Sequence, residues 1–339
     1  MRPIAKVPFP QACSIGGMDS LTQRLPFVMA VYRALGTGMV ISADSPIDDK
    51  VRSAMESLIE DYEHVLSRFR NDSLIAAIGK AEHGGSFDFP DWCAPLFDLY
   101  DALFSATSGA IDPCVGEDLI RLGYDASLSL TVTQDAPEHL GALRGRAVWG
   151  RDVTRHGTTL VTHEPVQLDF GACGKGYLVD LLGRMLQSSQ FVIDAGGDLL
   201  IHTEQPISVA LEDPEDQSHA IGIAHIANGA LCASAPSRRH WNMAVNERTQ
   251  IAIHHLLNAI DGLPAQQTEA SWAYVPANAT LNLARDYPTA VADGLATALF
   301  VSDVAQLQRT FDFAYATLDE SRQIAVSRNF PAELFLRSA

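Results

Sequence analysis

Short strand-like runs and stretches of helical repeat follow one another irregularly along this chain, and this mixture most constrains its fold. Apolar residues recur at helical spacing from Val51 to Phe69 and again on one face of residues 91–107. Strand-like runs lie between and after these stretches, with turn signals such as Asn228-Gly229 among them. The pattern therefore favours an α+β fold over a regularly alternating parallel sheet.

The expected elements can be placed along the chain. Ser45 is expected to cap the first long helix, with Pro46 in its first turn and Asp48 as the acid of a capping box. A helix at 177–186 is expected after a strand at 166–170, and residues 221–226 and 230–233 are expected to form a hairpin around Asn228-Gly229. The other expected elements are strands at 27–35, 38–43, 191–195 and 207–211, helices at 91–107, 290–301 and 304–313, and a closing hairpin of 315–318 and 323–326.

The domain organisation is expected to be simple. Residues 1–26 lack periodicity and are interpreted as a flexible leader, followed by a single domain over residues 27–339.

The charge balance excludes some classes of partner. The 339 residues include 24 Lys and Arg against 41 Asp and Glu, a formal net charge of −17. Nucleic-acid binders need basic surface, and anionic membranes repel an acidic one, so neither partner is expected. No apolar run approaches the length of a membrane span. The five scattered cysteines and the missing signal-peptide pattern predict a cytoplasmic protein with reduced thiols.

The strongest local motif is the glycine-rich segment from Asp169 to Tyr177. Its small residues let a ligand approach the main chain, and a following helix offers N–H groups to a phosphate. Lys175 adds a positive charge at the same place, and Asp169 is able to accept a hydrogen bond from a ring N–H. The alternative is an ordinary strand-to-helix turn with a solvated lysine.

A second pattern pairs Asp293 with Thr297, four residues apart on a predicted helix. This spacing puts a carboxylate and a hydroxyl on one helix face, and both are oxygen ligands of the kind that Mg²⁺ prefers. Such a pair is also common on ordinary helices, so the pattern alone does not decide.

Three further segments contain candidate site residues. His254-His255 ends a strand-like run and offers a general base, a core histidine or a zinc ligand, although no HExxH or thiol pair supports zinc. Residues 108–116 form a predicted loop, and residues 66–73 end a helix with Phe69, which is able to cover a flat ring or pack in the core.

These segments, in this order, resemble the ApbE family of FAD:protein FMN transferases. The resemblance spans about residues 30–328, and its most specific elements are Lys-Gly-Tyr at 175–177 and Asp-x-x-x-Thr at 293–297. The matching segments are 35–37, 66–73, 109–116 with Cys114 in place of Thr, 169–180, 194–198 and 292–298.

The resemblance implies a fold, a reaction and a site. It implies T-fold-related antiparallel sheets with packed helices, in two intimate lobes with the flavin between them. FMN would pass from FAD to a threonine or serine hydroxyl of an acceptor protein, and AMP would leave. Positioning and charge neutralisation would dominate such a phosphoryl transfer.

The resemblance also implies roles for individual residues. Mg²⁺ would be held by Asp293, Thr297 and the main-chain carbonyl of Ala172, Lys175 would offset developing charge, and His255 is the candidate base. The implied flavin-binding residues are Leu35, Phe69, Ala110, Ile111, Asp112, Asp169, Lys175, His255 and Leu257.

Two departures from the family pattern bear on activity. Ala233-Ser234-Ala235 stands where the family has Thr-Ser-Gly, and Asn258-Ala259 stands where it has Asp-Pro. The second change removes a carboxylate and a rigid turn near the implied site. Two alternatives therefore remain open: a Mg²⁺-dependent pyrophosphatase that cleaves FAD to FMN and AMP, and a non-catalytic FAD-binding protein.

Overall fold

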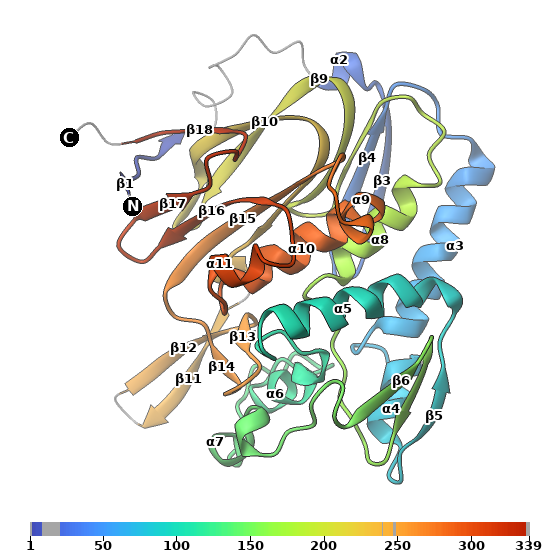
Figure 1. Cartoon of the computed structure of the whole chain (residues 1–339), viewed down its shortest axis with the longest axis vertical. Helices are drawn as coiled ribbons and strands as arrows, with labels where there is room; N and C mark the ends of the chain where they lie inside the picture. The colour runs from blue at the N-terminus through green and yellow to red at the C-terminus, as the bar shows by residue number, and fades with distance from the viewer. Residues whose placement is uncertain (1, 9–20, 239, 247–248, 337–339) are drawn as a thin grey trace.

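The computed structural model describes residues 2–8, 21–238, 240–246 and 249–336. In this part of the chain the largest feature is an 11-stranded sheet in the order β1-β17-β16-β15-β10-β9-β8-β4-β3, with β18 and β2 also paired to β10 (Figure 1). Its strands pair antiparallel. The strands are β1 (Arg2–Pro3), β2 (Val7–Pro8), β3 (Phe27–Ala34), β4 (Thr37–Ala43), β8 (Phe191–Asp194), β9 (Asp198–Asp213), β10 (Asp216–Ser234), β15 (Thr268–Pro276), β16 (Ala314–Asp319), β17 (Gln323–Val326) and β18 (Ala332–Leu334). The expected α+β class with antiparallel pairing is confirmed.

The longest strand, β10, corrects one prediction. Asn228-Gly229 does not form a hairpin, because β10 runs through it and pairs with β9 on one side and β15 on the other. The strand register shifts between Ile226 and Asn228, and Gly229 has a φ of 126°. A Cβ at Gly229 would lie 2.4 Å from the carbonyl oxygen of Val275. Gly229 therefore allows the strand irregularity and the close approach of β15, and it does not form a turn.

Helices α8 (Gly174–Gly183) and α10 (Pro288–Ala298) pack together against the sheet at β10 and β9 (Figure 1). They approach closely because a glycine lies at their contact: a Cβ at Gly176 would meet the carbonyl oxygen of Thr289 at 2.3 Å. Alternate residues of β10 point to opposite faces, so Cys232 joins the core under these helices while Leu231 joins a second core on the other face.

The other half of the molecule carries most of the remaining helices and a small sheet in the order β5-β7-β6 (Figure 1). Helix α5 lies where this half meets α10 (Figure 1). Its buried face includes Leu96, Tyr100 and Leu103. The elements are α3 (Asp49–Leu66), α4 (Leu74–Lys80), β5 (Gly85–Asp88), η1 (Asp91–Cys93), α5 (Ala94–Ala106), η2 (Pro113–Val115), α6 (Gly116–Arg121), α7 (Ala136–His139), η3 (Ala142–Arg144), β6 (Val153–His156) and β7 (Thr159–Thr162).

The short remaining elements complete the chain. They are α2 (Leu21–Arg24), η4 (Pro236–Arg238), β11 (His240–Asn246), β12 (Thr249–His254), β13 (Leu257–Asn258), β14 (Leu263–Pro264), α9 (Asn282–Asp286) and α11 (Val304–Leu307). Strands β11 and β12 form a separate two-stranded sheet, as do β13 and β14. No helix in the described ranges is both long enough and apolar enough to span a bilayer.

Several predicted boundaries are wrong. The first long helix begins at Asp49, and its cap is Asp48, which accepts a hydrogen bond from the N–H of Lys50; Ser45 is not the cap. Residues 166–170 form an irregular connection instead of a strand, and the next helix begins at Gly174 instead of Tyr177. The predicted helix at 304–313 ends at Leu307, and residues 311–313 are irregular.

The expected lack of structure in residues 1–26 does not hold for the residues that the structure describes there. Arg2–Pro3 pairs with β17 and Val7–Pro8 pairs with β10. Ile4 and Leu25 are buried in the second core. Residues 9–20 lie outside the described part, and the division into a leader and one domain stays a prediction.

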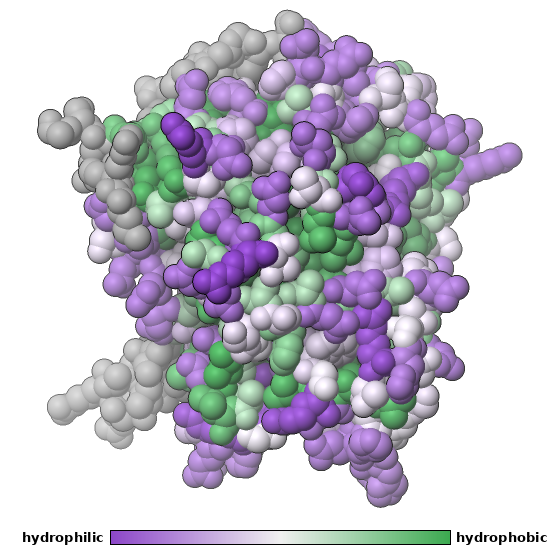
Figure 2. Space-filling view, in the orientation of Figure 1, coloured by the Kyte–Doolittle hydropathy of each residue, from purple (hydrophilic) through white to green (hydrophobic). Residues whose placement is uncertain are grey.

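The surface is mostly hydrophilic on the one face shown (Figure 2). On the face shown in Figure 2, hydrophilic residues cover most of the area, and apolar residues form small patches between them.

Candidate metal and flavin site

Lys175 lies between two buried carboxylates. Its Nζ is 2.7 Å from Asp198 Oδ2, 3.1 Å from Asp293 Oδ1 and 3.2 Å from Asp293 Oδ2. Both carboxylates are about 2% exposed at their side chains. The three residues come from the first turn of α8, the start of β9 and the middle of α10, so the packing of these elements creates the cluster.

A hydroxyl and a carbonyl oxygen lie next to this cluster. Thr297 Oγ1 is 3.4 Å from the carbonyl oxygen of Ala172, and Thr297 is one helical turn from Asp293. The contact follows from tight packing of α10 on the glycine-rich turn, since a Cβ at Gly294 would lie 3.3 Å from Cys173 Cβ. The structure therefore brings together the three predicted metal ligands and Lys175.

The glycine-rich turn is fixed by its own hydrogen bonds. Asp169 Oδ1 accepts a hydrogen bond of 2.6 Å from the N–H of Gly171, and the Tyr62 hydroxyl donates one of 2.7 Å to the carbonyl of Gly174. Gly176 donates its N–H to Asp293 Oδ2 at 3.0 Å. The carboxylate of Asp293 thus also binds the open N-terminal end of α8, which favours negative charge.

Asp180 holds the helix that carries Asp293 and Thr297. Its carboxylate accepts hydrogen bonds from the N–H groups of Thr289 at 3.1 Å and Ala290 at 2.8 Å. Helix α10 has no side-chain cap of its own, so a residue of α8 caps it from outside. This contact fixes the position of α10 relative to α8.

Burial and charge perturb the cluster strongly. Burial, together with the neighbouring carboxylate of Asp198, raises the pKa of Asp293 to about 7. Burial by itself lowers the pKa of Lys175, but the carboxylates of Asp198 and Asp293 outweigh it and raise the pKa above its usual value. Lys175 is therefore a cation at neutral pH.

Four aromatic and charged side chains form a second group beside the turn. Phe69 is 40% exposed and meets Tyr124 edge-on with ring centroids 5.4 Å apart. The rings of Tyr124 and His255 are 6.4 Å apart. The Arg68 guanidinium lies over both Phe69 and Tyr124 and forms a short ion pair with Asp169. Three predicted flavin residues, Phe69, Asp169 and His255, are thus connected through Arg68 and Tyr124.

Leu35 lies at the turn between β3 and β4. It has a φ of 52°, and its N–H donates to Glu63 Oε1 of α3 at 2.9 Å. The same turn reaches the start of β9, because a Cβ at Gly196 would lie 2.7 Å from Thr37 Oγ1. The turn that carries Leu35 therefore lies near the connection between β8 and β9, which precedes Asp198.

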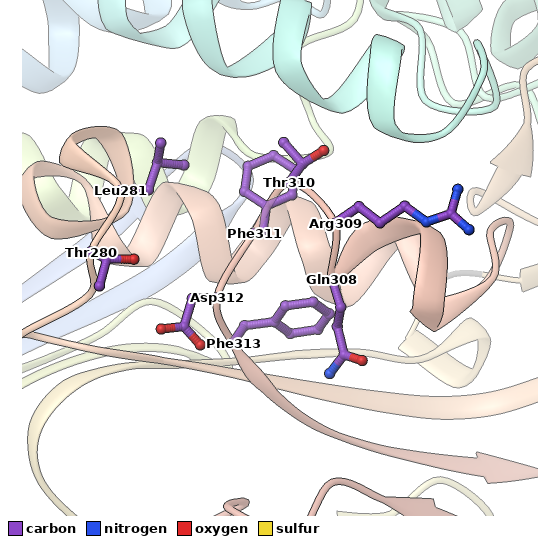
Figure 3. A pocket seen from close by; sticks show the side chains of 8 residues that line it. All are labelled: Thr280, Leu281, Gln308, Arg309, Thr310, Phe311, Asp312 and Phe313. Carbon is purple, nitrogen blue, oxygen red and sulfur yellow. The ribbon is translucent and has the colours of Figure 1, made fainter.

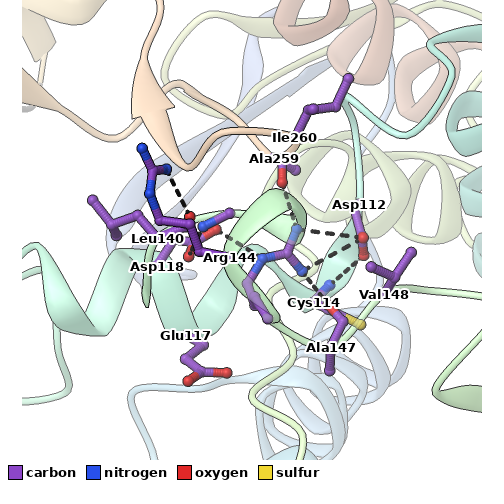
Figure 4. Close-up of polar contacts among 12 residues, drawn as sticks. Asp112, Cys114, Glu117, Asp118, Leu140, Arg144, Ala147, Val148, Ala259 and Ile260 are labelled. Atoms are coloured by element: carbon purple, nitrogen blue, oxygen red, sulfur yellow. Dashed lines mark hydrogen bonds and ion pairs between the residues drawn. The ribbon is translucent and has the colours of Figure 1, made fainter. Parts of the chain in front are cut away.

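Ala110, Ile111 and Asp112 are buried, and the carboxylate of Asp112 faces inward. It accepts a hydrogen bond of 2.8 Å from the N–H of Cys114 and lies 3.5 Å from Arg146 NH1. Arg146, which is fully buried, also forms an ion pair of 2.8 Å with Asp118 and donates to the carbonyl of Ala259 at 2.7 Å (Figure 4). Asp112 therefore holds the loop through its side chain.

The departure at Asn258-Ala259 is compensated by local hydrogen bonds. Asn258 Oδ1 accepts from the N–H of Ile260 at 3.0 Å, and the Ala259 N–H donates to the carbonyl of Ala110 at 3.0 Å. An asparagine side chain replaces a carboxylate well in such a turn. The segment therefore keeps a defined turn and its contact with the predicted flavin loop.

The two adjacent histidines have different environments. His254 is buried, and its Nε2 lies 2.8 Å from the carbonyl of Ala265 while its Nδ1 lies 3.2 Å from the N–H of Leu256. Burial lowers the pKa of His254. This residue is the core histidine, whereas His255 is partly exposed and near Tyr124. Leu257 is buried in the same small core as Tyr124.

A cavity of about 440 Å³ lies elsewhere, at the loops around α9 and α11 (Figure 3). Its lining includes Thr280, Leu281 and Arg309, and none of the predicted site residues. Polar and apolar side chains line it together, among them Asp312, Phe311 and Phe313 (Figure 3).

Sequence reasoning missed several residues that organise the site. Asp198 was part of a matched motif, but no role followed from its position. Asp180 ends the matched segment 169–180, and no role followed from its position there either. Arg68 precedes the predicted Phe69, and Arg146 lies in a segment without any motif. The ligand contacts of the predicted residues stay predictions.

The donor set suits Mg²⁺. Among the described residues there is no group of three or more His, Cys, Asp or Glu placed to hold a metal. The donors that do gather are a carboxylate, a hydroxyl and a main-chain carbonyl, which are hard oxygen ligands. Mg²⁺ is usually bound by one or two carboxylates and completes its shell with waters and phosphate oxygens, so these residues fit it.

Comparisons with known proteins agree with this fold and show the family. The curated FAD:protein FMN transferase of Treponema pallidum (strain Nichols) is 27% identical over 286 residues, which cover 74% of this chain and 72% of that protein. The ApbE protein of Thermotoga maritima superposes with a TM-score of 0.72 at 19% identity, over 91% of this chain and 99% of that one. The flavin transferase ApbE of Vibrio cholerae gives 0.71 at 16% identity, over 89% and 98%. The pattern of the ApbE family matches residues 35–317, which is most of the sequence, and the chain therefore belongs to the ApbE family.

Proposed function

We propose that this protein is an FAD:protein FMN transferase that moves FMN from FAD to a threonine or serine hydroxyl of an acceptor protein and releases AMP. The observation that carries the proposal is the meeting of Asp293, Thr297 and the Ala172 carbonyl beside Lys175. Family membership and the named activity of the Treponema pallidum relative support it.

The residues present would hold Mg²⁺ through the Asp293 carboxylate, the Thr297 hydroxyl and the Ala172 carbonyl. When bound, the ion would supply Lewis-acid polarisation of the FAD diphosphate. Lys175 binds the diphosphate as a second positive group and stabilises charge on the departing AMP phosphate. The positive end of the α8 dipole favours the same negative charge.

The flavin would lie between the half of the molecule with the large sheet and the half with α5 and the small sheet. Phe69 and Leu35 would pack on its ring system, and Ala110, Ile111, Asp112, Asp169 and Leu257 would line the remainder. The aromatic group around Arg68 supports this placement, because a partly exposed ring such as Phe69 has room to stack on a flat ligand.

His255 is the proposed general base toward the acceptor hydroxyl. Its partial exposure supports this choice over His254, whose two ring nitrogens already contact main-chain groups. The hydroxyl oxygen attacks the FMN-side phosphorus, its proton passes to His255, and the bond to the AMP oxygen breaks.

The test uses the purified chain with FAD, Mg²⁺ and an acceptor domain that carries a target threonine. Mass spectrometry should show the acceptor gaining the mass of FMN less one water, with one AMP released for each adduct. Free FMN and AMP without adduct would identify a pyrophosphatase, and intact FAD would identify a binding protein. The Asp293→Ala variant should lose the Mg²⁺-dependent reaction, and an active variant would remove Asp293 from the site.

A further inference from the structure

Lys175 is shared between two buried carboxylates in the arrangement observed. Its ammonium nitrogen lies 2.7 Å from Asp198 Oδ2 and 3.1 and 3.2 Å from the two oxygens of Asp293. Asp293 has its own second donor, the N–H of Gly176. For Asp293 to bind a metal, the contact between these two side chains must open, because the ammonium and the metal would compete for the same carboxylate oxygens.

Asp198 is the group that keeps Lys175 in place when that contact opens. It lies at the start of β9, its side chain is 2% exposed, and its contact with Lys175 is the shortest of the three. Its backbone is fixed as well, because its carbonyl accepts from the N–H of Ala195 at 3.0 Å within a tight turn. Asp198 is therefore the partner that Lys175 would keep while its contact with Asp293 is replaced.

The charges of the cluster also favour replacing the contact between Lys175 and Asp293 by a metal on Asp293. When both carboxyl groups are ionised, they and the one ammonium leave one net negative charge in a mostly buried place. A divalent cation would compensate that charge, with the remainder offset by the diphosphate. Without Asp198 the pair of Lys175 and Asp293 would be neutral, and the lysine would compete directly with the metal for the only carboxylate.

We propose that Asp198 is a positioning residue that holds Lys175 away from Asp293 when Mg²⁺ and the FAD diphosphate bind. This inference rests on the proposed magnesium site. Asp198 touches neither the metal nor the substrate in this account. Asp198 favours metal binding because it keeps the Lys175 ammonium in the site and away from the Asp293 carboxylate, which the metal needs.

The test is a Mg²⁺-binding isotherm, measured by calorimetry in the presence of AMP, on four forms of the full chain. Asp198→Asn should weaken Mg²⁺ binding about tenfold or more, because a neutral amide holds Lys175 less strongly than a carboxylate and leaves the ammonium on Asp293. Lys175→Met should bind Mg²⁺ at least as well as the wild type. The double variant should recover most of the affinity that Asp198→Asn lost, because the competing ammonium is absent.

The rescue in the double variant separates positioning from a structural role. If Asp198 only stabilised the fold, removing Lys175 as well would not restore metal binding. Asp194→Asn is the matched control: Asp194 is exposed, and its Oδ1 accepts from the N–H groups of Gly196 and Gly197 at 2.9 and 3.2 Å, which asparagine preserves. This variant should bind Mg²⁺ like the wild type, and a thermal unfolding curve checks that each variant folds.

The outcomes distinguish this inference from the proposed metal site. Unchanged binding in Asp198→Asn, or a double variant as weak as Asp198→Asn, would overturn the role of Asp198 while leaving the site intact. If the wild type itself bound no Mg²⁺ with AMP present, the magnesium site would be wrong and the inference would fail with it.

Discussion

Removal of the Asp180 carboxylate should destabilise the protein and disturb the metal site together. The N–H groups of Thr289 and Ala290 are both fully buried and both donate to Asp180. A buried donor without a partner costs about 1–3 kcal/mol. Burial raises the pKa of Asp180 to about 7, so relief from burying this carboxyl offsets part of the loss. We expect Asp180→Ala to lower the free energy of unfolding by about 2–4 kcal/mol.

Asp180→Asn should lose about half as much, because an amide has one acceptor oxygen and satisfies one of the two donors. Urea unfolding followed by circular dichroism measures both variants. Asp286→Ala, an exposed position just before α10, should change the free energy of unfolding by less than about 0.5 kcal/mol. Variants of Asp180 as stable as the wild type, with unchanged Mg²⁺ affinity, would refute the role of Asp180 as the cap of α10.

Three further perturbations test the packing and the loops. Gly176→Ala places a methyl group 2.3 Å from the carbonyl oxygen of Thr289 and should cost about 1–3 kcal/mol and weaken Mg²⁺ binding. Burial, opposed by the ion pair with Arg146, raises the pKa of Asp118 to about 6. The folded state therefore binds more protons than the unfolded state, and stability should fall by up to about 3 kcal/mol as the pH rises from about 4 to about 7, with a flatter profile in Asp118→Asn. Asn258→Ala removes a turn hydrogen bond and should cost about 1 kcal/mol.

Each of these three has its own check by urea unfolding. Gly38→Ala, where a Cβ would meet little more than a carbonyl oxygen at 3.9 Å, should be tolerated, and an equal loss at Gly38 and Gly176 would contradict the packing argument. Parallel pH profiles for the wild type and Asp118→Asn would show that Asp118 does not titrate as described. An Asn258→Ala variant of wild-type stability would show that the turn does not depend on this side chain.

The sequence was sufficient for the parts of the site that depend on local spacing. Asp293 and Thr297 share a face because four residues make about one helical turn, and this holds in any helix. Their meeting with Ala172 followed from the family resemblance. Thr297 Oγ1 lies 3.4 Å from the Ala172 carbonyl, and the role of these groups as metal ligands stays a prediction.

The contacts that depend on tertiary packing could not be read from the sequence. Asp198 meets Lys175 only because β9 begins beside the first turn of α8. Arg146, which lies outside every motif, meets Asp112 at a separation of 34 positions along the chain. Asn228-Gly229 is a strong local turn signal, but the pairing of β10 with strands on both sides outweighs it.

The most direct test of the account is a crystal structure of the protein with FAD and Mn²⁺ in place of Mg²⁺, with the metal located by its anomalous signal. The account predicts one peak bonded to an oxygen of Asp293, to Thr297 Oγ1 and to the Ala172 carbonyl, with Lys175 still on Asp198 and turned from Asp293 toward the diphosphate. A peak away from these oxygens, or bound FAD whose diphosphate does not reach them, would contradict it.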